Sequence, residues 1–315
     1  MKKDAIGIIG AGIAGLSCAR VLQKNGYAPV LLEKGRGVGG RVATRRTDEG
    51  FQFDHGAQYM TARSPEFCDV IAGLSDEGAA GIWSGADREV IVGTPSMNAI
   101  AKALAGGLDI RRNTRVTELS AGKGGWQAAT NLDSVFEFDR IIITAPQPQT
   151  VDLIGEEHPL SKAVAGVRMS PCWTLMVTFA DQHDIPFTSR SAPDSYLAWI
   201  ALNSSKPERP DTNSWVIQAS AEWSERNLER EPEDVAQEML LRLCGVLRVD
   251  PSSVLHRRAH RWRYARVEHP LGKPFCRNEA CTLYLGGDWC LDARVEAAWM
   301  SGKAIAEDLL GELNA

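Results

Sequence analysis

Short apolar runs and amphipathic stretches alternate at the start of the chain, a pattern typical of a parallel sheet flanked by helices. The first apolar run covers residues 5–9, and apolar positions at helical spacing follow over residues 14–22. A second apolar run covers residues 30–32. A strand, a helix and a second strand in this order predict a βαβ unit, in which the two strands lie parallel.

Three glycines lie where the first strand should turn into the helix. Gly10, Gly12 and Gly15 have the spacing G-x-G-x-x-G. In this motif the first glycine makes the tight turn, the second lets the backbone approach a pyrophosphate, and the third lets helix and strand pack closely. We expect the N–H of Ile13, at the start of the helix, to join this phosphate-binding turn.

The second strand ends in an acid at the distance that a dinucleotide site requires. Glu33 stands roughly 20 residues after the glycines, where a carboxylate accepts hydrogen bonds from the adenosine ribose. An acid at this position repels a ribose phosphate, so the nucleotide should be FAD or NAD rather than NADP. We expect Lys34, Gly40 and Arg41, which follow in a basic glycine-rich loop, to complete the site, with Arg41 reaching the phosphates. The alternative is a solvated basic loop.

Further strands follow at residues 110–119, in a glycine-punctuated hairpin over 122–138 and at 139–143, and Ser96 is a plausible N-cap of a helix. After residue 151 the character changes. The runs "WTLMVTF", "YLAWIAL" and "SWVIQAS" predict an antiparallel sheet, with a helical cover over residues 232–247. The chain then returns to a strand, "CTLYLGGD", and a terminal helix.

These patterns predict an α/β protein with a Rossmann-type dinucleotide-binding domain and an inserted α+β domain built on an antiparallel sheet. We expect the dinucleotide-binding domain to be discontinuous over residues 1–55, 90–150 and 280–315. The inserted domain should then contain residues 56–89 and 151–279.

Composition excludes several classes of partner. The formal net charge is -5 and the pI is about 5.8, which favours neither nucleic-acid binding nor a basic membrane anchor. The 7 cysteines are scattered and contain no C-x-x-C, so we expect reduced thiols in a cytoplasmic protein and no metal site. No apolar run is long enough to span a membrane.

The chain resembles a known family of flavoproteins. The segments "IIGAGIAGLSCARVL", "LLEKGRGVGGR", "RVTEL", "IITAP" and "LGGDW" occur in the order expected for FAD-dependent amine-oxidase-like proteins. The stretches "DHGAQYMTAR", "SKPERPDTNSWVIQASAEWSERNLE" and "HRWRYARV" are similar to the bacterial renalase family in particular. The resemblance covers nearly the whole chain.

The resemblance implies a two-domain flavoprotein with noncovalently bound FAD. The Rossmann-type domain would then be the FAD-binding domain, and the inserted α+β domain built on an antiparallel sheet would be the substrate domain. Its activity would be oxidation of the 2-dihydro or 6-dihydro isomers of NAD(P)H, giving NAD(P)+ and, with oxygen as acceptor, hydrogen peroxide. Hydride transfer from a dihydropyridine requires positioning over the flavin more than acid–base help, so we expect no catalytic acid or base.

The resemblance also implies roles for individual residues. For the cofactor, it adds to the glycine motif the following residues: Ala57, Gln58, Val116, Asp288, Val295 and Glu296. Val116 could instead be a core valine, and Asp288 a helix N-cap. The N–H groups of Val295 and Glu296 should face the flavin pyrimidine edge at the start of the terminal helix.

For the substrate, we expect a loop of five residues, a second loop and two aromatics: Ala57, Gln58, Tyr59, Met60, Thr61, Ser96, Met97, Trp262 and Tyr264. Gln58 could bind a nicotinamide carboxamide, and Tyr59 could supply a flat surface or pack under the flavin. Trp262 and Tyr264 could wall the pocket or belong to the core. His260 is expected to be a structural histidine.

Two other functions compete with this interpretation. The first is a flavin amine oxidase acting on a primary amine or polyamine. Such enzymes often use an active-site lysine, and residues 173–180, 196–202 and 256–267 contain none. The second is a non-catalytic flavin-binding protein, which the polar and aromatic loop after residue 56 disfavours.

Overall fold

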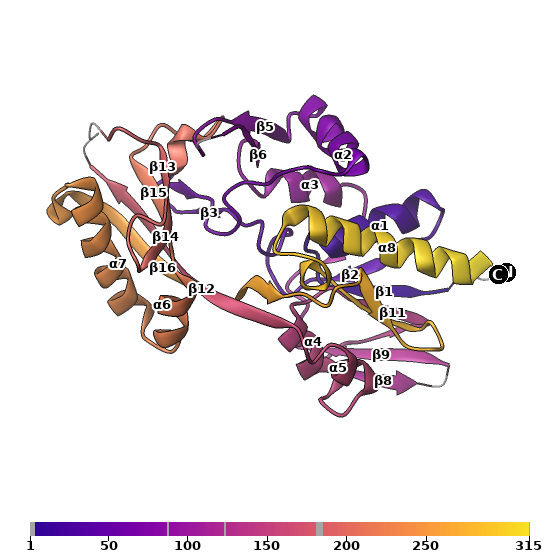
Figure 1. The fold of residues 1–315 in the computed structure, drawn as a ribbon. Helices are drawn as coiled ribbons and strands as arrows, with labels where there is room; N and C mark the ends of the chain where they lie inside the picture. The colour runs from indigo at the N-terminus through magenta and orange to yellow at the C-terminus, as the bar shows by residue number, and fades with distance from the viewer. Residues whose placement is uncertain (1–3, 87, 123, 181–184, 315) are drawn as a thin grey trace. The chain divides into compact units, whose positions relative to one another are not determined.

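The computed structural model describes residues 4–86, 88–122, 124–180 and 185–314, which form two compact units (Figure 1). Both units are discontinuous along the chain. Unit 1 contains Met1–Gly40, Ala101–Met169 and Val267–Ala315, and unit 2 contains Arg41–Ile100 and Ser170–Arg266.

The boundaries of these units differ from those expected. Residues 41–55 and 90–100 belong to unit 2, and residues 151–169 and 267–279 belong to unit 1. The cause in the first case is Asp54, whose buried carboxylate accepts hydrogen bonds from Arg209 in the other segment of unit 2, as well as from Thr44 and from the backbone of Met97. A polar cluster inside unit 2 therefore fixes segments that a strand pattern alone assigned to the nucleotide-binding domain.

Unit 1 is built on a mostly parallel sheet with strand order β17-β18-β11-β1-β2-β7. Strand β1 pairs in parallel with β2 and β11, and β11 pairs in parallel with β18. The carboxyl ends of these strands therefore lie at one edge of the sheet, and the chain order reverses between β1 and β11. The expected Rossmann-type fold is confirmed. The strands are β1 (Ile6–Ile9), β2 (Val30–Leu32), β7 (Asp109–Arg111), β11 (Arg140–Ile143), β17 (Phe275–Arg277) and β18 (Leu283–Gly286).

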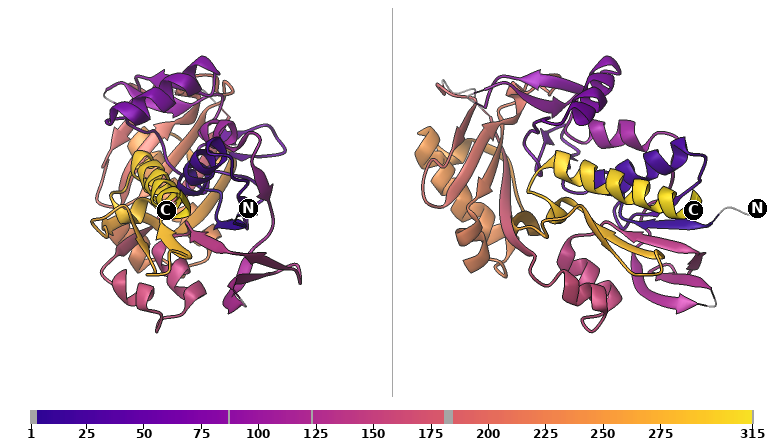
Figure 2. Two further views of the ribbon diagram at one scale, coloured as in Figure 1. Left: turned by 90° about the vertical axis from the view of Figure 1, so that its right-hand side faces the viewer. Right: turned by 45° about the vertical axis from the view of Figure 1, so that its right-hand side comes forward.

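The first and last helices of the chain, α1 (Ile13–Lys24) and α8 (Val295–Asn314), run alongside each other in both views of Figure 2. The Ser17 hydroxyl donates to the Trp299 carbonyl at 2.9 Å. Gly302 permits the contact, because a Cβ there would collide with the Ala14 carbonyl oxygen. The two backbones approach more closely than any larger residue would allow.

Unit 1 also contains a three-stranded antiparallel sheet in the order β10-β9-β8. The single strand expected over residues 110–119 is two strands, because Asn113 adopts φ 55° and turns the chain between them. The remaining elements are β8 (Val116–Gly122), β9 (Gly125–Thr130), β10 (Val135–Phe138), α4 (Gln147–Ile154), α5 (Pro159–Ala163) and the 3₁₀ turn η3 (Asp288–Cys290). Helix α3 (Ala99–Ala105) leads into unit 1 from unit 2.

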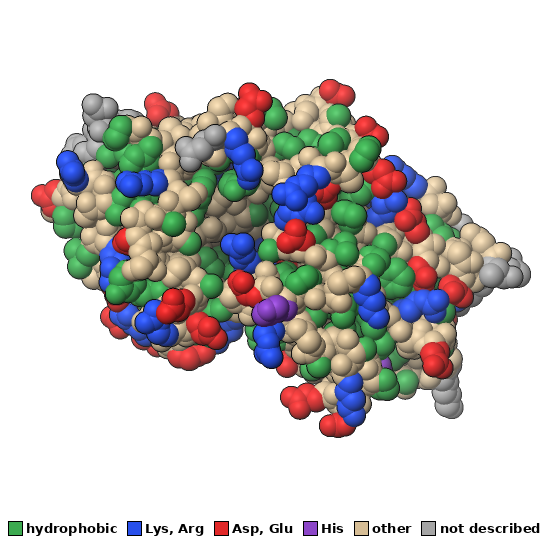
Figure 3. All heavy atoms as spheres, viewed as in Figure 1, with side chains coloured by type: hydrophobic (Ala, Val, Ile, Leu, Met, Phe, Trp, Pro, Cys, Tyr) green, Lys and Arg blue, Asp and Glu red, His purple; other side chains and the backbone are tan. Residues whose placement is uncertain are grey.

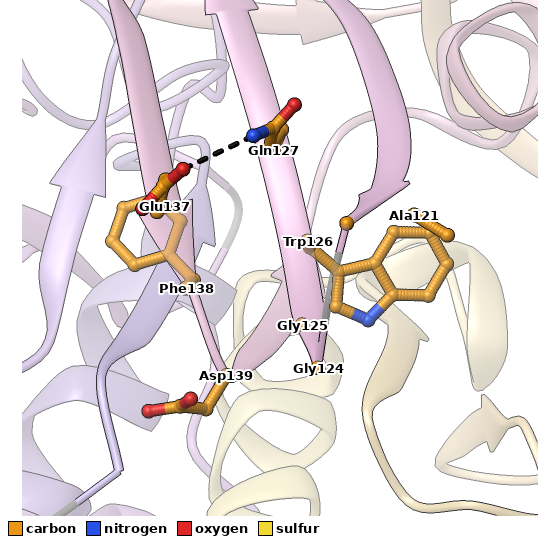
Figure 4. Close-up of a pocket in the computed structure, with 9 residues that line it drawn as sticks. Ala121, Gly124, Gly125, Trp126, Gln127, Glu137, Phe138 and Asp139 are labelled. Atoms are coloured by element: carbon orange, nitrogen blue, oxygen red, sulfur yellow. Dashed lines mark hydrogen bonds between the residues drawn. The ribbon is translucent and has the colours of Figure 1, made fainter.

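A cavity of about 710 Å³ opens at the end of this small sheet (Figure 4). Its polar side chains already have partners. Glu137 accepts a hydrogen bond from Gln127 at 3.0 Å, and Asp139 accepts one from the Ala5 N–H at 2.7 Å. The cavity is therefore a poor candidate for a reactive site.

Unit 2 is built on a five-stranded antiparallel sheet in the order β13-β14-β15-β12-β16, with α6 and α7 over one face (Figure 1). Three buried tryptophans, Trp173, Trp215 and Trp223, pack with the apolar side of α7 to form its core. Helix α7 spans Pro232–Leu247, as the sequence predicted. The sheet consists of β12 (Arg168–Phe179), β13 (Ser189–Ser191), β14 (Leu197–Leu202), β15 (Ser214–Ala219) and β16 (Val254–His269), and α6 covers Ala221–Arg226.

Two small hairpins and a helix, most of which the sequence did not predict, complete unit 2. Helix α2 begins after Ser64, whose hydroxyl accepts the Phe67 N–H. The elements are β3 (Arg45–Arg46), β4 (Gln52–Phe53), α2 (Pro65–Asp76), β5 (Ala80–Trp83), β6 (Val90–Gly93) and the 3₁₀ turns η1 (Asn203–Ser205) and η2 (Pro251–Ser253).

The surface is mixed in charge. On the face shown in Figure 3, Lys and Arg side chains are interspersed with Asp and Glu among the described residues. Within the described ranges, no helix has both the length and the apolar character needed to cross a membrane.

The close contact between α1 and α8 yields a stability prediction. Gly302→Ala should lower the free energy of unfolding by about 1–3 kcal/mol, because the added methyl group must push the two helices apart. Gly311 lies in the same helix with no heavy atom within 4 Å of a Cβ, so Gly311→Ala is the matched control and should stabilise by about 0.5–1 kcal/mol. Urea denaturation of the three proteins measures both effects, and equal stability of the two variants would contradict the prediction.

Candidate functional site

The glycine-rich turn of unit 1 has the geometry of a phosphate-binding loop. Gly10 adopts φ 102°, which only glycine tolerates well, and a Cβ at Gly15 would collide with the Gly10 carbonyl oxygen. A Cβ at Gly12 meets no heavy atom within 4 Å. No side chain caps α1 at Gly12, and the first N–H groups of an uncapped helix can bind an anion such as a pyrophosphate. Ile13 is the first residue of the helix, as expected.

Glu33 lies directly after β2 and next to this turn. Its carboxylate accepts the Ala11 N–H at 2.8 Å through one oxygen and the Gly35 N–H at 2.6 Å through the other. Each oxygen keeps a second acceptor position, so the carboxylate can also accept hydrogen bonds from ribose hydroxyls. The neighbouring Lys34 donates to Gln149 at 3.0 Å. Burial lowers the pKa of Lys34 below its ordinary value.

The loop after Glu33 folds back onto the glycine turn. The Gly39 N–H donates to the Ala11 carbonyl at 2.8 Å, and a Cβ at Gly40 would lie 3.5 Å from the Gly12 Cα. Gly40 is therefore placed beside the open phosphate position. Arg41, the first residue of unit 2, donates from its guanidinium to the Ala265 carbonyl of the same unit at 3.2 Å. Its role toward phosphate stays a prediction.

Three further predicted cofactor residues lie in unit 1 at the end of β18 and the start of α8. Asp288 follows Gly287 in η3, directly after the strand. Val295 begins α8, and the fully buried carboxylate of Glu296 forms an ion pair with Arg294 at 2.8 Å. Because β18 is parallel to β1, Asp288 lies at the same sheet edge as the glycine turn. Val116 begins β8 and its side chain is buried in the unit 1 core, while its expected cofactor contact stays a prediction.

The predicted substrate residues lie in unit 2, around a buried carboxylate that the sequence had not singled out. Asp54 accepts the Thr44 hydroxyl at 2.6 Å and the Met97 N–H at 3.0 Å. Arg209 donates to Asp54 through two nitrogens at 2.7 and 3.2 Å. Lys206 lies 3.4 Å from the same carboxylate oxygen. The side chains of Asp54, Lys206 and Arg209, here called the Asp54 cluster, are all 0% exposed.

The cluster perturbs the titration of its members. Burial alone would raise the pKa of the Asp54 carboxyl, but attraction to Lys206 and Arg209 and the hydrogen bonds from Thr44 and Met97 hold that pKa below its ordinary value. Burial lowers the pKa of Lys206 to about 8, although attraction to Asp54 opposes the shift. Near pH 7 the cluster thus contains an ionised carboxylate and a lysine whose pKa lies close to that pH.

Gln58 is anchored to this cluster rather than exposed to a ligand. Its amide N–H donates to the Asp54 carbonyl at 2.5 Å and to the Gly56 carbonyl at 3.1 Å. Its Oε1 accepts from Lys206 at 3.4 Å. Because the residue is buried and its amide braces its own loop, the geometry favours a positioning role for Gln58 over the direct carboxamide contact that we expected.

The rest of the loop presents an aromatic surface. The Tyr59 ring lies 5.7 Å from the Trp199 ring, and the Arg88 guanidinium lies 5.9 Å from the Tyr59 centroid. Ala57 and Thr61 are partly exposed. Met60 is buried and pairs through its backbone with Ile91, so its side chain belongs to the core.

The side chains of the second predicted loop are buried. Met97 is 0% exposed and its sulfur accepts the Gly93 N–H at 3.3 Å, while Ser96 is 1% exposed and accepts from Arg46 at 3.0 Å. Their contact with a substrate stays a prediction. Helix α3 begins at Ala99, so Ser96 is not its N-cap. This loop contributes to the Asp54 cluster through the backbone N–H of Met97, which donates a hydrogen bond to the Asp54 carboxylate.

Two histidines and a tryptophan form an aromatic group near β16. Trp262 donates to the His55 carbonyl at 2.9 Å, and its ring stacks on that of His55 at 5.3 Å. Burial, followed by repulsion from neighbouring cationic groups, lowers the pKa of His55 to about 3 and that of His260 to about 4. Both are therefore neutral near pH 7, and His260 is structural as expected. Tyr264 lies two residues further along β16 and is partly exposed.

The sequence analysis missed the Asp54 cluster itself. Lys206 and Arg209 occur in the irregular segment "SSKPERP", where charged residues are normally solvated. Asp54 lies about 150 positions earlier, and neither segment has a local pattern that indicates their contact.

Comparison with known families defines the class of protein. The model described as "Flavin containing amine oxidoreductase" matches residues 83–310, and that described as "NAD(P)-binding Rossmann-like domain" matches residues 8–74. The chain therefore belongs to the flavin-containing amine oxidoreductase family. It is a flavin-dependent oxidoreductase.

Among individual proteins, the chain is similar to renalase from Mus musculus, with 24% identity over 290 residues that cover 82% of this chain and 84% of the mouse protein. It is 47% identical to an L-amino acid oxidase from Cerastes cerastes, but only over 57 residues, or 18% of this chain and 11% of that protein. Within its family the chain is thus renalase-like.

Solved structures share the fold along almost the whole chain. A putative protoporphyrinogen oxidase from Exiguobacterium sp. 255-15 superposes with a TM-score of 0.78 at 15% identity, covering 99% of this chain and 100% of its own. A putrescine oxidase mutant gives a TM-score of 0.71 at 13% identity, covering 98% and 99%. The cofactor is FAD, for which noncovalent binding is typical in this family.

The Asp54 cluster yields a prediction about stability. Arg209→Met should lower the free energy of unfolding by about 1.5–3 kcal/mol, because Asp54 loses its two charged hydrogen bonds to Arg209 while Lys206 still compensates its charge. The matched control is Arg226→Met, which removes an exposed ion pair with Glu222 and should cost less than about 1 kcal/mol. Thermal and urea unfolding measure the difference. Equal losses in the two variants would show that Asp54 does not depend on Arg209.

Proposed function

We propose that this protein oxidises the 2-dihydro or 6-dihydro isomers of NAD(P)H to NAD(P)+, with oxygen as the final acceptor and hydrogen peroxide as the second product. The observation that carries the proposal is the extent of the similarity to mouse renalase, which covers 82% of this chain. The match to an L-amino acid oxidase covers only 18% of it. The dinucleotide motif that all these flavoproteins require accounts for a short match, but not for one that includes unit 2.

The residues of unit 1 would hold the cofactor. We expect the N–H groups at the start of α1 to bind the pyrophosphate, Glu33 to accept from the ribose, and Asp288 to contact the phosphate or ribityl region. The α8 N-terminus at Val295 would place positive partial charge beside the flavin. Bound FAD supplies the hydride acceptor.

The residues of unit 2 would position the substrate. Ala57, Tyr59 and Thr61 are the partly exposed members of the loop that Gln58 braces, and Tyr59 offers a flat ring edge to a pyridine. His55 and His260 are neutral near pH 7 and partly or fully buried, so they are poor proton carriers. This agrees with a hydride transfer in which no proton must first leave a carbon atom.

An amine oxidase remains the main rival. Unit 2 does contain a buried lysine, Lys206, but its side chain is 0% exposed and faces Asp54 and Gln58. It therefore presents no ammonium or amine to a substrate in this conformation. The similarity to putrescine oxidase is one of fold, at 13% identity.

Glu33→Ala tests the proposed ribose contact. The variant should bind FAD more weakly by about 1–3 kcal/mol, because it loses a hydrogen bond to a charged group. Glu137→Ala, which removes an exposed carboxylate of the same unit, should bind FAD normally. Titration of each apoprotein with FAD gives the affinities, and thermal unfolding of the apoproteins separates loss of binding from loss of the turn. An unchanged FAD affinity in Glu33→Ala would exclude the ribose contact.

The choice of substrate is tested by anaerobic stopped-flow absorbance at the flavin band. A 2-dihydro or 6-dihydro NAD isomer should reduce the flavin at least ~100-fold faster than ordinary 4-dihydro NADH, because hydride transfer tolerates little displacement of the donor carbon. Putrescine and other primary amines should reduce it slowly or not at all. Readmitted oxygen should then yield one hydrogen peroxide per flavin. Faster bleaching by an amine than by either isomer would replace this proposal with the amine oxidase.

A further inference from the structure

The Asp54 cluster contains two positively charged side chains and one negatively charged side chain. Two cations, Lys206 and Arg209, face one anion, and all three side chains are fully covered by protein. Arg209 approaches the carboxylate at 2.7 Å with one nitrogen and 3.2 Å with another, whereas Lys206 lies 3.4 Å away. Arg209 thus neutralises Asp54 by itself, and the Lys206 charge is the excess one.

Lys206 instead connects the cluster to the loop. Its Nζ lies 3.4 Å from Gln58 Oε1, and Gln58 in turn donates to the carbonyls of Asp54 and Gly56. These two bonds hold the backbone on either side of His55. Because one amide group makes all three contacts, the orientation of the Gln58 side chain is linked to whether Lys206 can donate to it.

We propose that Lys206 is a positioning residue of the loop over residues 54–61, which it holds through Gln58 only while its amine carries a proton. The charged ammonium donates to Gln58 Oε1 and fixes the amide in the orientation that braces the loop. The neutral amine is a weaker donor and loses its attraction to Asp54, so the brace loosens and Ala57, Tyr59 and Thr61 are held less firmly.

The surroundings of Lys206 favour loss of that proton at moderate pH. The charged groups that face it among the described residues are Asp54 and Arg209, and Trp83 covers it with a ring centroid 5.4 Å from Nζ. Burial lowers its pKa from 10.5 to about 8. Between these two pH values the unfolded chain binds the proton and the folded chain does not, so this group's contribution to the free energy of global unfolding rises with pH there. The loosening of the loop is a separate change within the folded state.

The test uses the FAD-loaded protein and needs no substrate. With lysine side chains labelled with ¹³C, one signal should titrate near pH 8 and be missing from Lys206→Met and from Lys206→Arg. Hydrogen exchange of the segment 54–61, corrected for the intrinsic effect of pH, should be about tenfold faster at pH 9 than at pH 7 in the wild type.

The variants separate charge from packing. The segment should exchange fast at both pH values in Lys206→Met and slowly at both in Lys206→Arg, whose guanidinium stays charged. Lys162→Met, which removes an exposed lysine of unit 1, should behave as wild type. A Lys206 signal that titrates above pH 10, or loop exchange that ignores pH in the wild type, would overturn the proposal.

The consequence for catalysis rests on the proposed function and has its own readout. The substrate concentration at half-maximal flavin reduction should rise about tenfold from pH 7 to pH 9 in the wild type but not in Lys206→Arg. Titration and exchange as expected, combined with no oxidation of dihydro-NAD isomers, would keep Lys206 as a positioning residue and remove only the substrate assignment.

Discussion

A carboxylate that is removed from water must find a partner, and in unit 2 this constraint at Asp54 organises three separate loops. Thr44, the Met97 N–H and Arg209 reach the same carboxylate from segments far apart in the chain. An unpaired buried charge costs several kcal/mol, so the loops cannot separate without a large penalty. The apolar core under the sheet contributes most of the buried surface of unit 2, but the Asp54 cluster determines where the loop after β4 lies. The cluster therefore positions this loop as well as stabilising the unit.

Unit 1 obeys a different constraint, that of close backbone approach. Gly15 lies against the Gly10 carbonyl, and Gly302 lies against the Ala14 carbonyl. Both contacts draw α1 tightly into the unit, one toward β1 and the other toward α8. The open space at Gly12 lies between neighbours that are fixed in this way.

The sequence predicted unit 1 well because its signals are local. The glycine spacing, the apolar run of β2 and Glu33 occur within one short segment, and each has a single structural interpretation. The bounds of α7 could also be predicted, because Pro232 marks its start and an apolar stripe follows its length. The substrate loops were harder. Gln58, Ser96 and Met97 have polar or adaptable side chains that suit a binding loop as well as a core, and only their burial distinguishes the two. The same holds for Lys206, whose partners lie about 150 positions earlier in the chain.

The contact between α1 and α8 also affects the order in which the protein can fold. Unit 1 is assembled from the beginning, the middle and the end of the chain, and α8 is its last helix. During synthesis α1 emerges before α8, so the contact between these two helices can form only after residues 295–314 emerge. Unit 2, whose last segment ends at Arg266, can close first. The contact that holds α1 against α8 therefore forms only after all segments of unit 2 have been made.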